Sequence, residues 1–120
     1  MKFFSSHTPE ILRPAVAGRF YPADPTQLSQ DIHSYLDHAD IQPADHPVLA
    51  VLAPHAGYVF SGPVAGFSYR YVQNQNPDTV LVIGLCHRGL DEACLFAGSS
   101  FQTPLDRKST RLNSSHVSES

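Results

Sequence analysis

The chain has 120 residues, 42% of them apolar and 16% charged, with a formal net charge of −3, which fits one soluble domain with a core of ordinary size. The acidic balance argues against a nucleic-acid partner, and no apolar run is long enough for a transmembrane helix or a signal peptide. Two cysteines do not make a disulfide framework, so we expect a cytoplasmic location.

The first predicted helix follows an apolar segment, residues 14–21, which we expect to be extended. Asp24 can cap a helix, Pro25 suits its first turn, and Gln27 completes a capping-box pattern. Residues 40–47 contain two prolines and two aspartates and predict a loop. Between cap and loop, the apolar residues recur on one face of a helix of about four turns: Leu28, Ile32, Tyr35, Leu36 and Ala39.

Two apolar runs of strand length predict buried parallel strands. Residues 48–53 (VLAVLA) and 79–84 (TVLVIG) are apolar almost throughout, as in strands that are covered on both faces. Between them, Ser61 can cap a helix over about residues 62–72. Strand, helix and strand in this order form a βαβ unit. With a weaker strand at 93–97, the predicted fold class is α/β, with a mainly parallel central sheet and flanking helices.

The last part of the chain, residues 106–120, has a different composition. It contains five serines and shows no apolar periodicity. One interpretation is a natural disordered terminus. The other is a non-native tail, such as translated adapter sequence, which is excluded from reasoning about the fold. We expect residues 1–105 to form the domain part and residues 106–120 a disordered, non-native tail.

Each predicted strand of the βαβ unit is followed by a histidine: His55 after residues 48–53 and His87 after residues 79–84. In an open α/β sheet, ligands bind outside the carboxyl ends of the parallel strands, so both imidazoles would emerge at one edge. Because neighbouring strands lie about 4.8 Å apart, both side chains could reach one metal ion. The alternative is that each histidine is an ordinary hydrogen-bonded loop residue. Two ligands are also fewer than the three that transition-metal sites normally have.

Three further side chains near these histidines are candidates with open alternatives. The helix that starts near Ser61 would present N–H groups that favour an anionic ligand. Tyr58 could offer a hydroxyl to the same crevice, or it could simply pack. Cys86, next to His87, could be a metal ligand or a redox thiol, or it could pack at the strand end.

Four segments together resemble the Memo family, whose bacterial members are called AmmeMemoRadiSam system protein B. Their order and spacing match across residues 13–105, after which family members continue much further. The resemblance implies that residues 1–105 are the N-terminal part of a longer Memo-like domain. The four segments are 13–22 (RPAVAGRFYP), 53–65 (APHAGY, then SGPVA), 83–88 (IGLCHR) and 101–105 (FQTPL).

The resemblance implies a fold similar to class III extradiol dioxygenases and a metal site whose ligands include His55 and His87. This chain has Gly84-Leu85-Cys86 where Gly-Pro-Ser is usual in the family. The family's third ligand, a cysteine far downstream, has no counterpart here. Iron or copper is the implied metal, with zinc also open.

The resemblance also implies a function for the intact protein, which is non-haem iron or copper redox chemistry on a substrate near Tyr58 and Ser61. The alternative is a non-catalytic scaffold of enzyme ancestry that binds a small molecule, a peptide or a protein in the crevice. The family name implies an AMMECR1-like protein and a radical SAM protein as partners. An incomplete sheet leaves an unpaired edge, so we expect the isolated chain to aggregate, to bind metal weakly and to be inactive.

Overall fold

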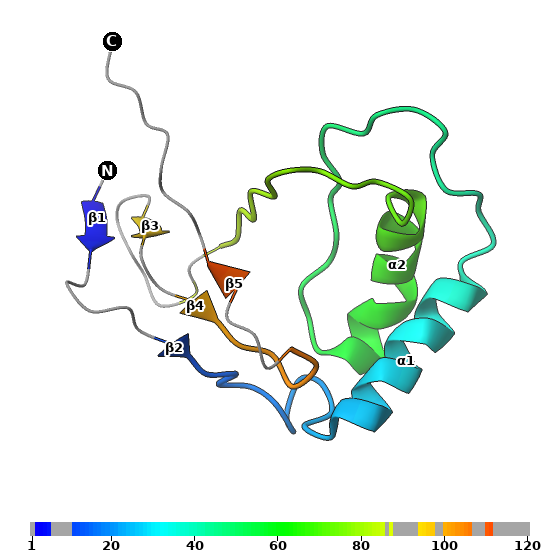
Figure 1. The fold of residues 1–120 in the computed structure, drawn as a ribbon. Coiled ribbons are helices and arrows are strands. Elements are labelled where there is room, and N and C mark those ends of the chain that lie inside the picture. Colours follow the sequence, from blue (N-terminus) through cyan, green and yellow to red (C-terminus); the bar gives the residue numbers. More distant parts are fainter. Residues whose placement is uncertain are drawn as a thin grey trace, which may run out of the picture. The chain divides into compact units, whose positions relative to one another are not determined.

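The computed structural model describes residues 2–5, 11–85, 87, 94–97, 100–106 and 110–111 (Figure 1). The chain divides into two compact units. We call Ala15–Val80 the helical unit, because it contains helices α1 (Pro25–His38) and α2 (Tyr58–Tyr71). Met1–Pro14 together with Leu81–Ser120 form the strand unit. Within the described ranges, no helix is long and apolar enough to cross a membrane.

Short strands make up the strand unit, and most of their pairings are parallel. β1 pairs with β3 in parallel, and β2 pairs in parallel with β4, which in turn pairs antiparallel with β5. The α/β class is therefore confirmed, and so is a strand close to the predicted range 93–97. The strands are β1 (Lys2–Ser5), β2 (Ile11–Leu12), β3 (Cys94–Ala97), β4 (Ser100–Phe101) and β5 (Thr110–Arg111).

Strand β5 lies within residues 106–120, the segment that the sequence predicts to be a disordered, non-native tail. Residues 107–109 and 112–120 lie outside the described part of the chain. The origin of the tail and the domain boundary at residue 105 stay predictions.

The βαβ unit that the sequence predicts is not formed in the structure. Residues 48–53 and 79–84 have no strand assignment. Leu52 is 92% exposed and Ile83 is 87% exposed. An apolar run becomes a strand only when a neighbouring strand completes its backbone hydrogen bonds and other elements cover its faces. Neither run has a strand neighbour among the residues that the structure describes, so neither forms a strand and both are largely exposed.

Helix α1 begins where its sequence predicts. The side chain of Asp24 accepts a hydrogen bond from the Gln27 N–H at 2.8 Å, which satisfies one of the N–H groups that lack a partner within the helix. The second half of the capping box does not form, because the Gln27 amide donates to the Asp31 carboxylate at 2.7 Å instead. On the inner face of the helix, Leu28 is only 3% exposed.

Replacement of the cap, Asp24→Ala, is expected to lower the free energy of unfolding of the helical unit by about 1 kcal/mol. Urea unfolding followed by circular dichroism at 222 nm measures the change. Asp37→Ala is the matched control, because this exposed carboxylate lies near the C-terminal end of the same helix. There a negative charge opposes the helix dipole, so its removal should leave stability unchanged or slightly higher. Equal losses from both variants would contradict the capping role.

Helix α2 starts one turn earlier than predicted. The sequence predicts a helix over about residues 62–72 with Ser61 as its cap, but the helix spans Tyr58–Tyr71 with Gly57 at the cap position. The Tyr58 N–H donates to the Phe20 carbonyl at 2.7 Å. A carbonyl from another part of the chain therefore satisfies the first helical N–H, and this allows the earlier start. Pro63 consequently lies inside the helix.

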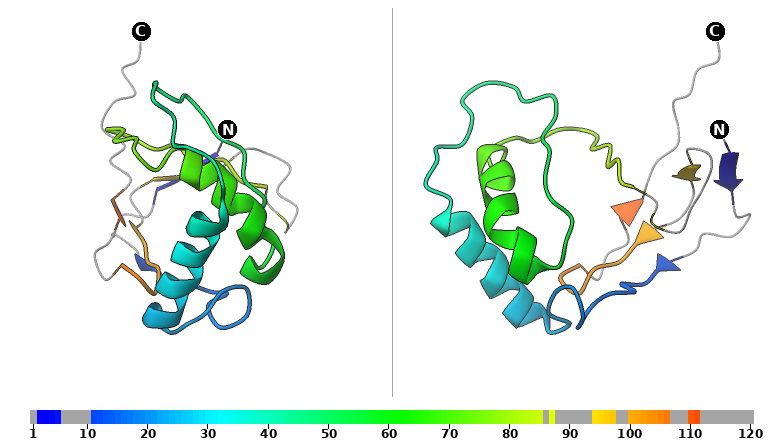
Figure 2. Two further views of the ribbon diagram at one scale, coloured as in Figure 1. Left: turned by 90° about the vertical axis from the view of Figure 1, so that its right-hand side faces the viewer. Right: turned by 180° about the vertical axis from the view of Figure 1, so that it is seen from behind.

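Helices α1 and α2 pack directly against each other, as the views in Figures 1 and 2 agree. Gly62 and Gly66, both buried on α2, face Tyr35 of α1. A Cβ atom at Gly62 would lie 2.4 Å from the Tyr35 ring, and one at Gly66 would lie 2.4 Å from the Tyr35 carbonyl oxygen. The two glycines therefore allow the close approach of the helices.

Residues 14–21 form a tight turn and are not the extended segment that the sequence predicts. The N–H of Gly18 donates to the Tyr21 carbonyl at 2.7 Å, and the N–H of Phe20 donates to the Val16 carbonyl at 2.9 Å. Gly18 has a φ of 78°, in the left-handed region that glycine adopts without strain. The turn brings Phe20 and Tyr21 to the start of α2.

Candidate functional site

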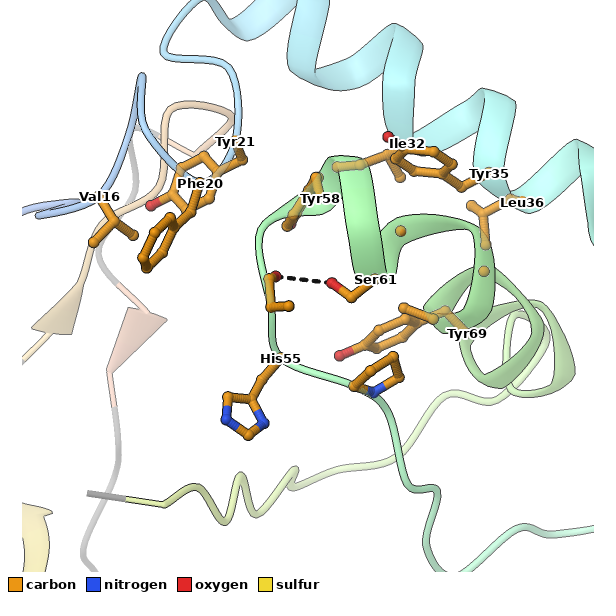
Figure 3. Close-up of a pocket in the computed structure, with 15 residues that line it drawn as sticks. Val16, Phe20, Tyr21, Ile32, Tyr35, Leu36, His55, Tyr58, Ser61 and Tyr69 are labelled. Atoms are coloured by element: carbon orange, nitrogen blue, oxygen red, sulfur yellow. Dashed lines mark hydrogen bonds between the residues drawn. The ribbon is translucent and has the colours of Figure 1, made fainter. Parts of the chain in front are cut away.

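A pocket in the helical unit brings together three of the five candidate site residues that the sequence indicates. His55, Tyr58 and Ser61 all line it, and its volume is about 570 Å³. Figure 3 shows Tyr58 and Ser61 at the start of α2 and His55 on the loop that leads into this helix. The rest of the lining comes from the turn at residues 16–21, from Pro54 and Ala56 of the same loop, and from the facing sides of α1 and α2.

Ser61 holds the loop before α2 in place. It is 6% exposed, and its hydroxyl lies 2.8 Å from the carbonyl oxygen of Ala56 and 3.3 Å from that of Gly57 (Figure 3 marks the shorter bond). One hydroxyl proton serves these two acceptors, so a bound ligand would find in Ser61 only an acceptor oxygen. The observed role of Ser61 is therefore to fix the backbone next to His55.

Tyr58 lies at the centre of an aromatic cluster. Its ring centroid is 5.4 Å from that of Tyr21 and 6.4 Å from that of Tyr35, in tilted and edge-on arrangements that aromatic rings favour. Partial burial, and then repulsion from the phenolate forms of Tyr21, Tyr69 and Tyr35, raise the pKa of Tyr58 above its ordinary value of 10.0. The phenol is therefore neutral at physiological pH and can donate a hydrogen bond.

The two predicted metal ligands belong to different units. His55 is exposed at the edge of the pocket in the helical unit, and His87 is exposed in a turn of the strand unit. Their convergence on one ion stays a prediction. Cys86, the neighbouring candidate, lies outside the described residues.

The imidazole nitrogen atoms of His55 and His87 are the type of ligand that transition metals prefer. Imidazole nitrogen binds iron, copper and zinc, whereas magnesium and calcium prefer oxygen ligands. Across the described ranges, no group of three or more His, Cys, Asp or Glu side chains could hold a metal ion. The described residues therefore offer suitable donors without a complete set of three.

The other histidines of the helical unit are engaged locally. The Nδ1 atoms of His33 and His38 lie 2.7 Å and 2.6 Å from the carbonyl oxygens of Ser29 and Ser34, one turn back on α1. His46 Nδ1 lies 3.0 Å from the Asp45 carboxylate. These contacts agree with the structural or solvent-facing roles that helical and loop positions imply.

Sequence reasoning missed the tyrosines that surround Tyr58 in the pocket. Tyr21, Tyr35 and Tyr69 come from a turn and from two different helices, so no local spacing links them. The sequence does contain an indication that the two helices pack together. Gly62 and Gly66 are four residues apart and therefore lie on one face of the helix.

The fold and the pocket together define an α/β protein with a histidine at the edge of a tyrosine-rich pocket. Residues 13–109 match the family model described as Memo-like protein, so the chain belongs to the Memo family. This range includes both predicted ligands and the whole pocket.

Curated relatives agree with this assignment. A MEMO1 family protein of Nitrosopumilus maritimus is 36% identical over 101 residues, which are 79% of this chain and 36% of the relative. The corresponding protein of Methanopyrus kandleri is 41% identical over 102 residues, 77% of this chain and 36% of the relative. One of Metallosphaera sedula is 37% identical over 118 residues, 89% of this chain and 41% of the relative. The chain thus spans between a third and a half of these relatives' lengths, and no solved structure matches it.

Proposed function

We propose that this chain carries part of the transition-metal site of a Memo-family protein, with His55 and His87 as neutral imidazole ligands. The observation that supports the proposal is the pocket in which His55 lies beside Tyr58 and Ser61. The sequence indicates these three residues for different reasons. His55 follows a predicted strand, Ser61 lies at a predicted helix start, and Tyr58 belongs to the same short motif as His55. Iron or copper is the metal that we propose, in a fold related to that of extradiol dioxygenases.

The residues of the pocket have distinct roles in this proposal. The hydrogen bond from Ser61 to the Ala56 carbonyl orients the backbone that carries His55. The neutral hydroxyl of Tyr58 offers a donor to an organic ligand, and the aromatic lining excludes water from it. A bound iron or copper would supply one-electron redox chemistry.

The ligand assignment is tested by copper binding to the 120-residue chain. Substoichiometric Cu²⁺ is added at low protein concentration, bound copper is measured after gel filtration, and nitrogen ligands are identified by electron paramagnetic resonance. We expect two imidazole nitrogens and weak binding. His55→Ala or His87→Ala should each lower the affinity by at least about tenfold, or about 1.4 kcal/mol, with one nitrogen lost.

His33→Ala is the matched control, because His33 is an exposed histidine of the helical unit that is engaged only within α1. It should leave copper binding unchanged. If His55→Ala and His87→Ala bind copper like the parent chain, or if all three variants lose it equally, the ligand assignment is wrong.

A binding scaffold without redox chemistry is the second candidate, and the apolar, tyrosine-rich lining favours it. In that case the pocket holds a peptide or small molecule, and an AMMECR1-like or radical SAM protein is a candidate partner in the cytoplasm. The two proposals predict different ligand binding for one variant, His55→Ala. Tyr58→Ala would abolish ligand binding in both, whereas His55→Ala would leave it intact only in a scaffold.

A further inference from the structure

The pocket beside His55 combines several aromatic rings with a lining that carries no formal charge. Four tyrosines contribute to its wall, together with Phe20. None of the described residues that line it is an aspartate, glutamate, lysine or arginine. A ligand in this pocket is therefore held by aromatic faces and hydroxyl groups, without an ion pair. The tyrosines, labelled in Figure 3, are Tyr21, Tyr35, Tyr58 and Tyr69.

The start of α2 offers few free donors to an anion in this pocket. The N–H of Tyr58 donates to the Phe20 carbonyl at 2.7 Å, as described above. The N–H groups of Phe60 and Ser61 donate to the Gly57 carbonyl at 2.9 Å and 3.0 Å. The sequence favours an anionic ligand at this helix start, because free N–H groups bind anions. Three of the first four helical N–H groups are already bonded, so this attraction is largely used within the chain.

The charge of the helical unit favours a cation over an anion. Ala15–Val80 contains six aspartates and two arginines, and neither glutamate nor lysine, so its formal net charge is −4 with histidine neutral. A negative net charge raises the local concentration of cations and lowers that of anions. The faces of tyrosine rings act in the same direction, because the ring quadrupole places negative potential on each face.

We propose that the pocket binds an organic cation of the quaternary ammonium class through cation–π contacts with its tyrosines. This inference rests on the pocket of the proposed function and names the class of its organic ligand. A cation is attracted to a ring when it lies within about 6 Å of the ring centroid. The centroid of Tyr58 is 5.4 Å from that of Tyr21 and 6.4 Å from that of Tyr35, so one cation can contact more than one ring.

The tyrosine hydroxyls favour a pocket that stays open to water over a contact surface for another part of the fold. In a dry contact, each phenol hydroxyl would need a hydrogen-bond partner. In an open pocket water fills this role, and Tyr69 is indeed 57% exposed. A quaternary ammonium group has no N–H of its own, so it can lie against the rings without any hydrogen-bond partner.

Three small molecules of similar shape and different charge test the proposal. Choline is the cation, neohexanol is its neutral analogue with carbon in place of nitrogen, and the carboxylate of tert-butylacetic acid is the anion. Each is titrated into the 120-residue chain with a chelator present and followed by proton nuclear magnetic resonance. We expect choline to bind at least about fivefold more tightly than neohexanol, and the anion to bind most weakly. The N-methyl resonance of choline should shift upfield, because ring currents act on a group that lies over aromatic faces.

Substitutions of single rings show whether the tyrosines produce this preference. Tyr69→Leu keeps an apolar side chain at an exposed position and should lower the affinity for choline by about threefold, with little change for neohexanol. Tyr58→Leu should reduce the preference in the same way, whereas Tyr58→Phe keeps the ring and should retain it. Tyr71→Leu is the matched control, because Tyr71 lies on the same helix but packs against His46 outside the pocket. Circular dichroism confirms that the helices persist in each variant.

The proposal is overturned if choline does not bind, or if neohexanol binds as tightly as choline. The second result would show an apolar surface without charge preference, as expected of a face that another part of the fold covers. Equal losses from Tyr69→Leu and Tyr71→Leu would also contradict it. Because these titrations contain no metal, their failure leaves the copper test of His55 and His87 unaffected, and the reverse also holds.

Discussion

Gly66→Ala is expected to destabilise the helical unit by about 3 kcal/mol, at the upper end of the cost of overpacking. The added methyl group would lie 2.4 Å from the Tyr35 carbonyl oxygen. Because this oxygen belongs to the backbone of α1, no side-chain rotation can relieve the contact. The helices must separate, and the gain of alanine over glycine in helix propensity, about 1 kcal/mol, is too small to compensate.

Gly62→Ala is expected to behave differently, because its methyl group meets the ring of Tyr35. Combination with Tyr35→Ala removes the ring, so the double variant should lose less stability than the sum of the two single changes. The same combination should not rescue Gly66→Ala. Urea unfolding followed by circular dichroism at 222 nm measures the three single variants, the two double variants and the parent chain.

Gly84→Ala is the control for these substitutions, because a Cβ atom there meets nothing within 4 Å. Its stability should match that of the parent chain. A Gly66→Ala variant that is as stable as the parent would show that the helices do not approach as closely as the structure has them. Rescue of Gly66→Ala by Tyr35→Ala would show that the ring, and not the backbone, sets the distance.

The 120-residue chain by itself is expected to be only marginally stable and to bind a hydrophobic dye such as anilinonaphthalene sulfonate. Among the described residues, the buried apolar side chains are those of Leu28, Ala39 and Ala44. This core is small, whereas many large apolar side chains remain exposed, such as Leu81 at 73% and Val82 at 86%. Little apolar area is therefore removed from water to offset the loss of chain entropy.

Two substitutions distinguish dye binding to exposed apolar side chains from dye binding caused by a loosened core. Leu49→Lys should reduce dye binding and leave the helical signal unchanged, because this side chain is fully exposed. Leu28→Ala should increase dye binding and lower the helical signal, because it removes the largest buried apolar side chain among the described residues, at a cost of about 2–5 kcal/mol. A parent chain with a sharp thermal transition and no dye binding would contradict the expectation of marginal stability.

Helix α1 shows how far local sequence can predict the fold. Its cap at Asp24 and its inward face at Leu28 follow from residues within a few positions of each other. Helix α2 shows the limit, because its start depends on the Phe20 carbonyl, which is supplied by a distant turn. The pocket was predictable in part. His55, Tyr58 and Ser61 share one short motif, whereas the surrounding tyrosines are brought together only by packing.

The sequence by itself determined the family, the position of α1 and the short stretch that carries His55. These features depend on residue identity and on hydrogen bonds between near neighbours. Only the tertiary structure decided whether residues 48–53 and 79–84 become strands, because a strand's hydrogen bonds are made to a distant segment. Residues 48–53 have the apolar composition of a buried strand, yet they lie exposed along α2. A run that favours a strand by composition takes on that structure only when a partner lies beside it.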